Sequence, residues 1–169
     1  LLLGALTMVL VGILTPIMRK IAISVGAVKL FVSATISSFS DVAESARFGA
    51  SLDALLVGLR SRLPAHSVYC AVETVKRRGY FDTPVSATTT DLDALQASTH
   101  LLFLYPTRVP TSALIELGYA IALRMPVVAI TGTRASLPFM AQAFDEILPN
   151  FVLLELDLLN AESHPQIIE

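Results

Sequence analysis

Glu116 is the one charged residue in the stretch Val109–Leu123, whose sequence is VPTSALIELGYAIAL. An apolar run, HLLFLY, precedes the stretch at His100–Tyr105, and another follows it at Val127–Ile130. A helix between two buried strands is expected to pack on both flanks, so its carboxylate must be paired, hydrogen-bonded or protonated. Two interpretations are open. Glu116 is either an acidic residue favoured by the dipole at a helix N-terminus or a catalytic carboxylate.

The composition limits the classes of protein to which the chain can belong. Apolar residues make up 54% of the 169 residues and charged residues 15%, against about 45–50% and 25% in an average soluble domain. The excess indicates an apolar N-terminus and a parallel sheet covered on both faces. The net charge is −2, and no basic run is longer than Lys76–Arg78. Nucleic acid is therefore not expected as a partner.

Sequence motifs for cofactors and metals are absent from the chain. It contains neither a Gly-x-Gly-x-x-Gly dinucleotide motif nor a P-loop, the two Gly-rich motifs that cradle phosphates. The three histidines, His66, His100 and His164, lack the spacing of metal ligands. The single Cys70 cannot form an internal disulfide and is expected to be a buried thiol. The sequence thus predicts no cofactor and no metal site.

Residues 1–18, LLLGALTMVLVGILTPIM, carry no charge. As a helix they would span roughly 27 Å, close to the thickness of a bilayer's hydrocarbon core. Arg19 and Lys20 follow at once, and the positive-inside rule then places the remainder of the chain in the cytoplasm. We expect a single-pass membrane helix at 1–18, truncated at its start, and a linker at 19–27. A signal peptide and a buried core or oligomerisation helix are the alternatives.

From Val28 onward, short apolar runs alternate with helical patterns, as in a βαβ architecture. The strands are expected at Lys29–Ala34, Ser67–Val72, Leu101–Tyr105, Val127–Thr131 and Phe151–Leu156. The helices are expected at Asp41–Leu63 (capped by Ser40), Thr90–Ala97 (capped by Thr88, Thr89 or Thr90), Thr111–Arg124 and Pro138–Ile147. The predicted fold class is α/β, a Rossmann-like three-layer sandwich with a mostly parallel five-stranded sheet over residues 28–169.

Ligands of such folds lie at the carboxyl ends of the strands, and polar residues gather there in this sequence. They are Ser33, Thr35, Ser37, Ser38 and Ser40 after the first strand; Glu73, Lys76–Arg78 and Tyr80 after the second; Arg108, Thr111, Ser112 and Glu116 after the third; and Thr131, Thr133 and Arg134 after the fourth. We therefore expect a ligand site at this edge of the sheet.

The run TTDLDALQASTHLLFLYPTRVPTSALIELGYAIALRMPVVAIT, from Thr89 to Thr131, resembles the catalytic half of the nucleoside 2-deoxyribosyltransferase family. KLFVSA and SVYCAVE resemble the first two strands of that family, so the resemblance covers roughly Lys29–Thr131. Its most specific element is Glu-Leu-Gly-Tyr-Ala. The resemblance implies that Glu116 is a nucleophile attacking the anomeric carbon of a sugar, and that Asp91 contacts the sugar and nucleophile region. Asp91 could equally be an ordinary first-turn aspartate.

Other site residues follow from position. Phe31 falls where the family often has Tyr, and Ser112, one turn before Glu116, could bond a sugar hydroxyl or the carboxylate. The loop Thr107–Pro110 lacks the acid with which many members protonate the leaving base. Arg108 and the serine-rich first loop, with Ser33, Thr35 and Ser37, would instead suit a 5′-phosphate. Tyr80 is a further candidate for substrate binding.

The predicted function is cleavage of the N-glycosidic bond of a nucleoside or nucleotide, with NAD as a further possible substrate, and by hydrolysis rather than base transfer. The architecture is similar to membrane-tethered effectors of antiphage systems. The alternative is a catalytically silent nucleotide-sensing or scaffold domain attached to a membrane helix. The resemblance also implies a homo-oligomer, since family members lend an asparagine across a subunit interface. Asn150 and Asn160 give no clear match to it.

Overall fold

The computed structural model describes residues 28–35, 39, 41–64, 67–73, 83–109, 111–159 and 167. The predicted membrane segment at 1–18 and the linker at 19–27 lie outside these residues. Within the described part of the chain, no helix combines the length and the apolar character that crossing a bilayer requires.

Five parallel strands form one sheet, in the order β2-β1-β3-β4-β5. The strands are β1 at Leu30–Ala34, β2 at Val68–Cys70, β3 at His100–Tyr105, β4 at Val127–Thr131 and β5 at Phe151–Glu155. The predicted parallel five-stranded sheet is confirmed. Because the strand order reverses between β1 and β3, the crevice at their carboxyl ends is where a doubly wound fold binds its ligand.

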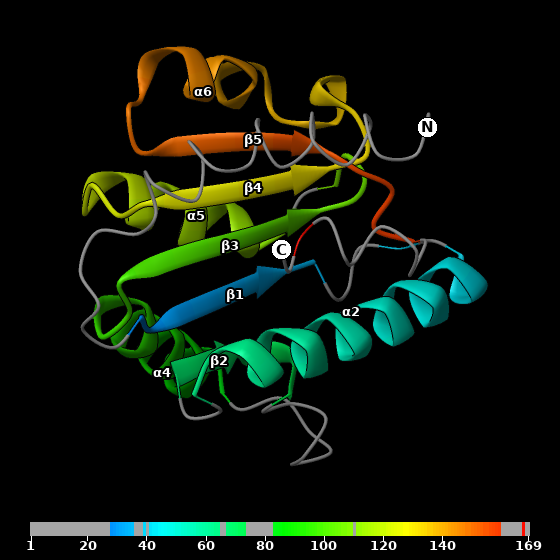
Figure 1. Cartoon of the computed structure of the whole chain (residues 1–169), viewed down its shortest axis with the longest axis horizontal. Helices are drawn as coiled ribbons and strands as arrows, with labels where there is room; N and C mark the ends of the chain where they lie inside the picture. The colour runs from blue at the N-terminus through cyan, green and yellow to red at the C-terminus, as the bar shows by residue number, and fades with distance from the viewer. Residues whose placement is uncertain are drawn as a thin grey trace, which may run out of the picture.

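Helices cover both faces of the sheet (Figure 1). The long helix α2, Val42–Arg62, packs on one face, and α4, Pro84–Gln96, and α5, Ala113–Ala122, pack on the other. Between β4 and β5 the chain forms two 3₁₀ turns, η2 at Arg134–Ser136 and η3 at Phe139–Ala143, and a single helical turn, α6 at Phe144–Ile147. The three layers enclose two apolar clusters, one on each side of the sheet.

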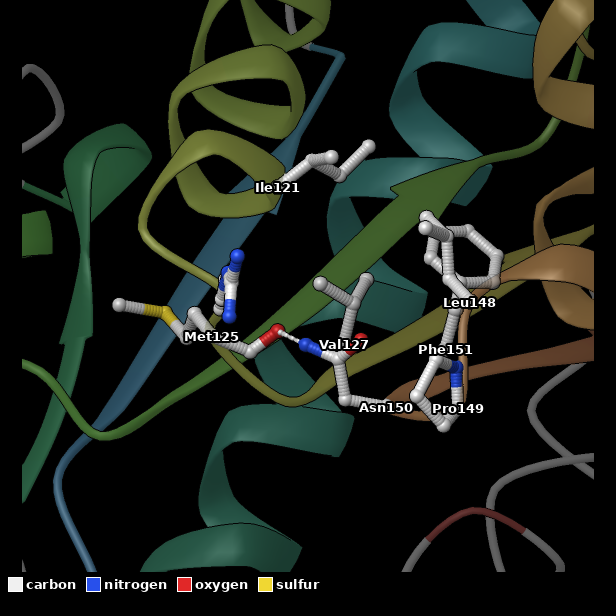
Figure 2. A pocket seen from close by; sticks show the side chains of 8 residues that line it. Ile121, Met125, Val127, Leu148, Pro149, Asn150 and Phe151 are labelled. Carbon is white, nitrogen blue, oxygen red and sulfur yellow. Dashed lines mark hydrogen bonds between the residues drawn. The ribbon is translucent and has the colours of Figure 1, made fainter.

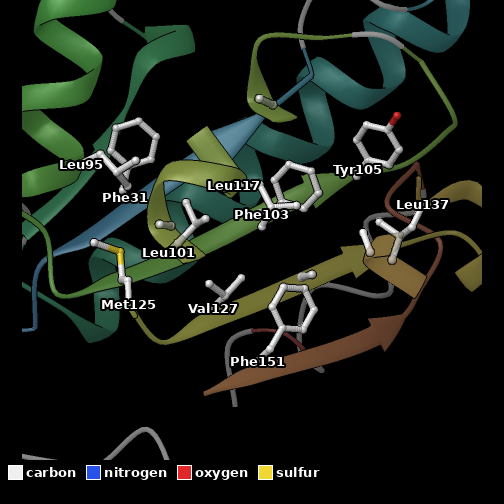
Figure 3. Close-up of a cluster of buried hydrophobic side chains, with 14 residues drawn as sticks. Phe31, Leu95, Leu101, Phe103, Tyr105, Leu117, Met125, Val127, Leu137 and Phe151 are labelled. Carbon is white, nitrogen blue, oxygen red and sulfur yellow. The ribbon is translucent and has the colours of Figure 1, made fainter. Parts of the chain in front are cut away.

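Side chains on the α4/α5 face change from apolar to polar along the strands. Near the amino ends, Tyr69, Phe31, Leu101, Val127 and Phe151 form one continuous row across all five strands, and Figure 3 shows the last four of these inside the cluster. One step further along lie Ser33, Phe103 and Ala129, and after them Thr35, Tyr105 and Thr131. The core therefore ends in a polar edge at the carboxyl ends of β1, β3 and β4.

The structure corrects four sequence-based boundaries. The cap of α2 is Asp41, whose carboxylate accepts from the amides of Ala43 and Glu44 at 2.6 and 3.3 Å; it is not Ser40. Helix α4 begins at Pro84 and not at Thr90, because Thr83 caps it and Pro84 is its first residue. The second strand is only three residues long. The segment expected as one helix at Pro138–Ile147 is a 3₁₀ turn, η3, followed by the single helical turn α6.

The expectation that the Glu116 helix packs on both flanks is also wrong. Ile115 is 68% exposed and Leu123 45%, so α5 buries one side and presents an apolar side outward. Cys70, in contrast, is a buried free thiol as expected, and burial raises its pKa to about 12.

Candidate active site

Glu116 is the fourth residue of α5, within the first turn, and its carboxyl group is largely withdrawn from water. Loss of solvation raises the pKa of Glu116 to about 7. The negative charge of Asp91 acts in the same direction, while the nearby hydroxyl of Ser33 favours the ionised form and partly opposes the rise in pKa. The structure therefore brings Glu116, Asp91 and Ser33 together from three elements: α5, α4 and β1.

Ser33 and Thr35 are buried hydroxyl-bearing residues at the carboxyl end of β1, 2% and 0% exposed. Neither hydroxyl completes a hydrogen bond of normal geometry with another described residue. A buried hydroxyl without a partner costs about 1–3 kcal/mol, so these two groups are available to a polar group of a ligand, as far as the described residues show. Their position at the β1/β3 crevice, beside Glu116, is that of a substrate site.

Asp91 lies in the interior of α4, eight residues into the helix, and not in a first turn. Its Oδ1 accepts a hydrogen bond of 2.7 Å from the Tyr69 hydroxyl. Burial raises the pKa of Asp91, and the bond from Tyr69 lowers it in part. Tyr69, on β2, is a site residue that the sequence analysis missed.

Phe31 is fully buried and contacts the Tyr69 ring, with centroids 5.2 Å apart. It forms the apolar floor under Tyr69 and has no surface exposed to a ligand.

The loop after β3 is held in shape by Tyr105. The Tyr105 hydroxyl donates to the Val109 carbonyl at 2.6 Å and accepts from the Val109 amide at 3.0 Å. Arg108, between them, is exposed and makes no hydrogen bond or ion pair with another described residue. The neighbouring loop after β4 comes close, because Gly132 leaves room for the Pro106 carbonyl, which a Cβ there would meet at 3.0 Å.

Several predicted site residues have other positions or partners. Ser112 is exposed at the start of α5 and makes no capping bond, so Ser33 and not Ser112 acts on the Glu116 carboxyl. Ser37 and Tyr80 lie outside the described residues. Glu73 pairs with Arg60 at 2.5 Å, and Arg134 pairs with Asp145 at 2.7 Å. These two ion pairs are structural, so neither Glu73 nor Arg134 is available to a ligand.

The opposite edge of the sheet carries a cavity of about 330 Å³. Figure 2 shows it at the amino ends of β4 and β5, where its lining includes Met125, Val127 and Phe151. The Asn150 amide donates to the Met125 carbonyl there at 2.7 Å, so this asparagine is engaged at the edge away from Glu116. The cavity is not part of the candidate site.

Among the described residues, no group of three or more His, Cys, Asp or Glu side chains could hold a metal ion. Glu116 and Asp91 are the two carboxyls that the site brings near one another. Two neighbouring carboxyl groups with raised pKa values, next to unpaired hydroxyls in a crevice, are suited to general acid–base or nucleophilic work on a polar organic substrate.

No protein-family model matches the chain, and no curated protein matches it in sequence. Among solved structures, it is similar to that of a CMP N-glycosidase from Clostridium botulinum, BcmB, at 12% sequence identity and a TM-score of 0.56. The match covers 82% of this chain and 98% of the glycosidase chain. At this identity the likeness is one of fold: the chain has the α/β fold of the CMP N-glycosidase BcmB, with a five-stranded parallel sheet.

Proposed function

We propose that the protein cleaves the N-glycosidic bond of a nucleoside or nucleotide, with Glu116 as the nucleophile. The observation that carries the proposal is the Glu116 carboxyl, buried at the β1/β3 crevice beside Asp91 and the unpaired Ser33 hydroxyl. A carboxylate on a rigid helix with little solvation is a suitable nucleophile. The shared fold with a CMP N-glycosidase and the Glu-Leu-Gly-Tyr-Ala element support the assignment.

The reaction would proceed by double displacement. A Glu116 carboxylate oxygen attacks the anomeric carbon, and the bond from that carbon to the base nitrogen breaks. The base leaves with the electron pair and takes up a proton, so an ester between the sugar and Glu116 remains. Water then attacks the same carbon, loses a proton, and releases the carboxylate. We propose hydrolysis rather than transfer to a second base, because the loop Thr107–Pro110 has no acid to exchange protons with a base.

The nucleophile must be ionised, and this sets the direction of the pH dependence. The pKa of Glu116 is raised to about 7 in the folded protein. Below that value the carboxyl is protonated and cannot attack. The kcat/KM of the free enzyme should therefore rise about tenfold per pH unit below pH 7 and level off above it.

The test is release of free base from nucleosides, nucleotides and NAD by the wild type, Glu116→Gln and Glu146→Gln. Glu146 is an exposed carboxylate on α6 and serves as the matched control. Loss of the nucleophile should lower the rate by several orders of magnitude, while Glu146→Gln should leave it unchanged. Near wild-type release by Glu116→Gln would refute the assignment. Nucleotide binding without any base release by the wild type would favour the silent sensing domain.

We further propose that Arg108 binds a 5′-phosphate. Its exposed guanidinium follows β3, the strand next to β1, and is not held by another described residue. Arg108→Ala should weaken the binding of a nucleoside monophosphate by roughly 1.5–3 kcal/mol and leave the binding of the nucleoside unchanged. Arg124→Ala, at the opposite edge, is the control. Equal losses of binding free energy for the nucleoside and its monophosphate would show that Arg108 does not recognise the phosphate.

A further inference from the structure

Tyr69 is held at both ends of its side chain. Its ring lies against the fully buried Phe31, with which it is in register on the neighbouring strand, at a centroid distance of 5.2 Å and an interplanar angle of 33°. Its hydroxyl donates to Asp91 Oδ1 at 2.7 Å. The bond joins the edge strand β2 to the middle of α4, across 22 residues of sequence.

The second oxygen of Asp91, Oδ2, has no hydrogen-bond partner among the described residues. A carboxylate fixed through one oxygen has a defined orientation, and its other oxygen can then accept a hydrogen bond from a ligand hydroxyl. The negative charge of Asp91 also acts on the Glu116 carboxyl. The Tyr69 bond therefore influences two things at once: where the second oxygen points and how near a negative charge lies to Glu116.

We propose that Tyr69 is a positioning residue of the active site, which fixes the Asp91 carboxylate beside Glu116 and leaves Oδ2 for a sugar hydroxyl. The inference rests on the proposed function of Glu116. Tyr69 does not touch the reacting atoms itself. It acts through Asp91, by the same logic by which outer partners orient catalytic groups in other sites.

Asp91 is surrounded by few ionisable groups among the described residues. Asp91 faces Tyr69 from β2 and Glu116 from α5. Tyr119, also on α5, is bonded to Gln96 at the end of α4. Asp93, on the same helix as Asp91, is exposed. Cys70, the next residue on β2, belongs to the cluster on the other face of the sheet. The Tyr69 hydroxyl is thus the described donor that stabilises the ionised form of Asp91, and its removal should raise the pKa of Asp91.

The experiment follows the carboxyl carbons of Asp91 and Glu116 by NMR titration in the wild type, Tyr69→Phe and Tyr119→Phe. Tyr119→Phe is the matched control, since it also removes a hydroxyl bonded to α4, but one that comes from α5 and is paired with the neutral Gln96. In Tyr69→Phe, Asp91 should titrate at a higher pH than in the wild type, because the bond that favours its ionised form is lost. Tyr119→Phe should leave both midpoints in place. Unchanged midpoints in Tyr69→Phe would overturn the proposal.

A double-mutant cycle with Asp91→Asn separates positioning from general support of the fold. Tyr69→Phe should lower kcat by about 10- to 100-fold in the wild type, as misplacement of a catalytic group does, and should cost nothing more in the Asp91→Asn background. An equal loss in both backgrounds, with a lower melting temperature, would show a structural role and refute positioning. Absence of any base release by the wild type would instead refute the proposed function, while the titrations still decide whether Tyr69 governs the carboxyl pair.

Discussion

At the scale of single residues, Glu116 combines two opposing requirements. Its burial disfavours the ionised form, which is the form that a nucleophile needs, and raises its pKa to about 7. Ser33 partly compensates, because its hydroxyl favours the carboxylate. The buried carboxylate therefore lowers the free energy of unfolding at neutral pH while it serves the reaction.

This trade-off predicts that Glu116→Gln stabilises the protein in a pH-dependent way. The folded-state pKa is raised above the unfolded value of about 4.5, so the stabilising contribution of Glu116 is fully present below pH 4.5 and is lost as the pH rises through 7. Glutamine is never ionised and escapes this loss. The variant should exceed the wild type in free energy of unfolding by up to about 3 kcal/mol at pH 8, and by much less at pH 5. Denaturant unfolding at both pH values measures this. A variant less stable than the wild type at pH 8 would contradict the burial of an ionised carboxylate.

The sequence allowed some site residues to be identified and not others. Glu116 could be found because a single charge in an apolar helix needs an explanation, and Ser33 because it is a polar residue near the carboxyl end of a buried strand. Tyr69 could not be found in this way, because an aromatic residue in an apolar strand has the same sequence pattern in a binding site as in a hydrophobic core. Its role depends on Asp91, 22 residues away, and so on the packing of α4 against β2.

At the scale of elements, α5 ends in a backbone conformation that its sequence does not favour. Arg124 has a φ of 56°, in the left-handed region that L-residues other than glycine seldom adopt. The Met125 amide donates to the Ala120 carbonyl and the Arg124 amide to the Ile121 carbonyl, both at 2.9 Å. These two bonds make a Schellman motif, in which glycine is the preferred residue at the position of Arg124.

Arg124→Gly should therefore stabilise the protein, by about 1 kcal/mol, since it removes the left-handed strain of a residue with a Cβ. Thermal unfolding measures the gain. Arg124→Ala is the control, because it deletes the same side chain but keeps the Cβ and should give no comparable rise. A rise shared by both variants would attribute the effect to the guanidinium and not to the backbone.

Strand boundaries were predictable where a short apolar run lies between polar or turn-forming residues. β4 has the expected bounds, and β1, β3 and β5 differ from them by one residue. The start of α4 was missed although Thr83 and Pro84 form a cap followed by a first-turn proline. The reason is its composition: four of its first seven residues are Ser or Thr, which compete with the helix through local hydrogen bonds. Most of these residues are exposed, and α4 packs through its second half, where Leu95 is buried. The Thr83 cap and Pro84 therefore set the start of the helix.

At the scale of the whole molecule, the two edges of the sheet differ in character. The carboxyl edge gathers Ser33, Thr35, Asp91 and Glu116, while the amino edge holds the apolar cavity near Met125 and Val127. The alternation of strands and helices was enough to predict this polarity, because it fixes the direction of parallel strands. The strand order was not predictable from it, since short apolar strands carry no information about their neighbours.

The membrane segment remains a prediction from the sequence. Residues 1–18 contain no charge, and Arg19 and Lys20 follow, so the chain should stay with membranes after a carbonate wash, with residues 28–169 on the cytoplasmic side. The control is a chain that begins at Val28, which should be released. Recovery of the chain that includes residues 1–18 in the wash would argue for a buried helix instead.

The Tyr105 hydroxyl, bonded to both backbone groups of Val109, affects what ligand binding costs in conformational entropy. We expect these two bonds to restrict residues 106–109 before a substrate arrives, so that the substrate does not have to restrict them. Ordering a residue costs about 1–2 kcal/mol. Tyr105→Phe should thus weaken nucleotide binding by about 1–3 kcal/mol, through a less favourable entropy and with the Glu116 titration unchanged. Calorimetry of nucleotide binding in the Glu116→Gln background measures the enthalpy and the entropy of binding. A loss of affinity that is purely enthalpic would contradict the prediction. Because the hydroxyl holds the loop in its binding conformation in advance, less conformational entropy is lost when the substrate binds.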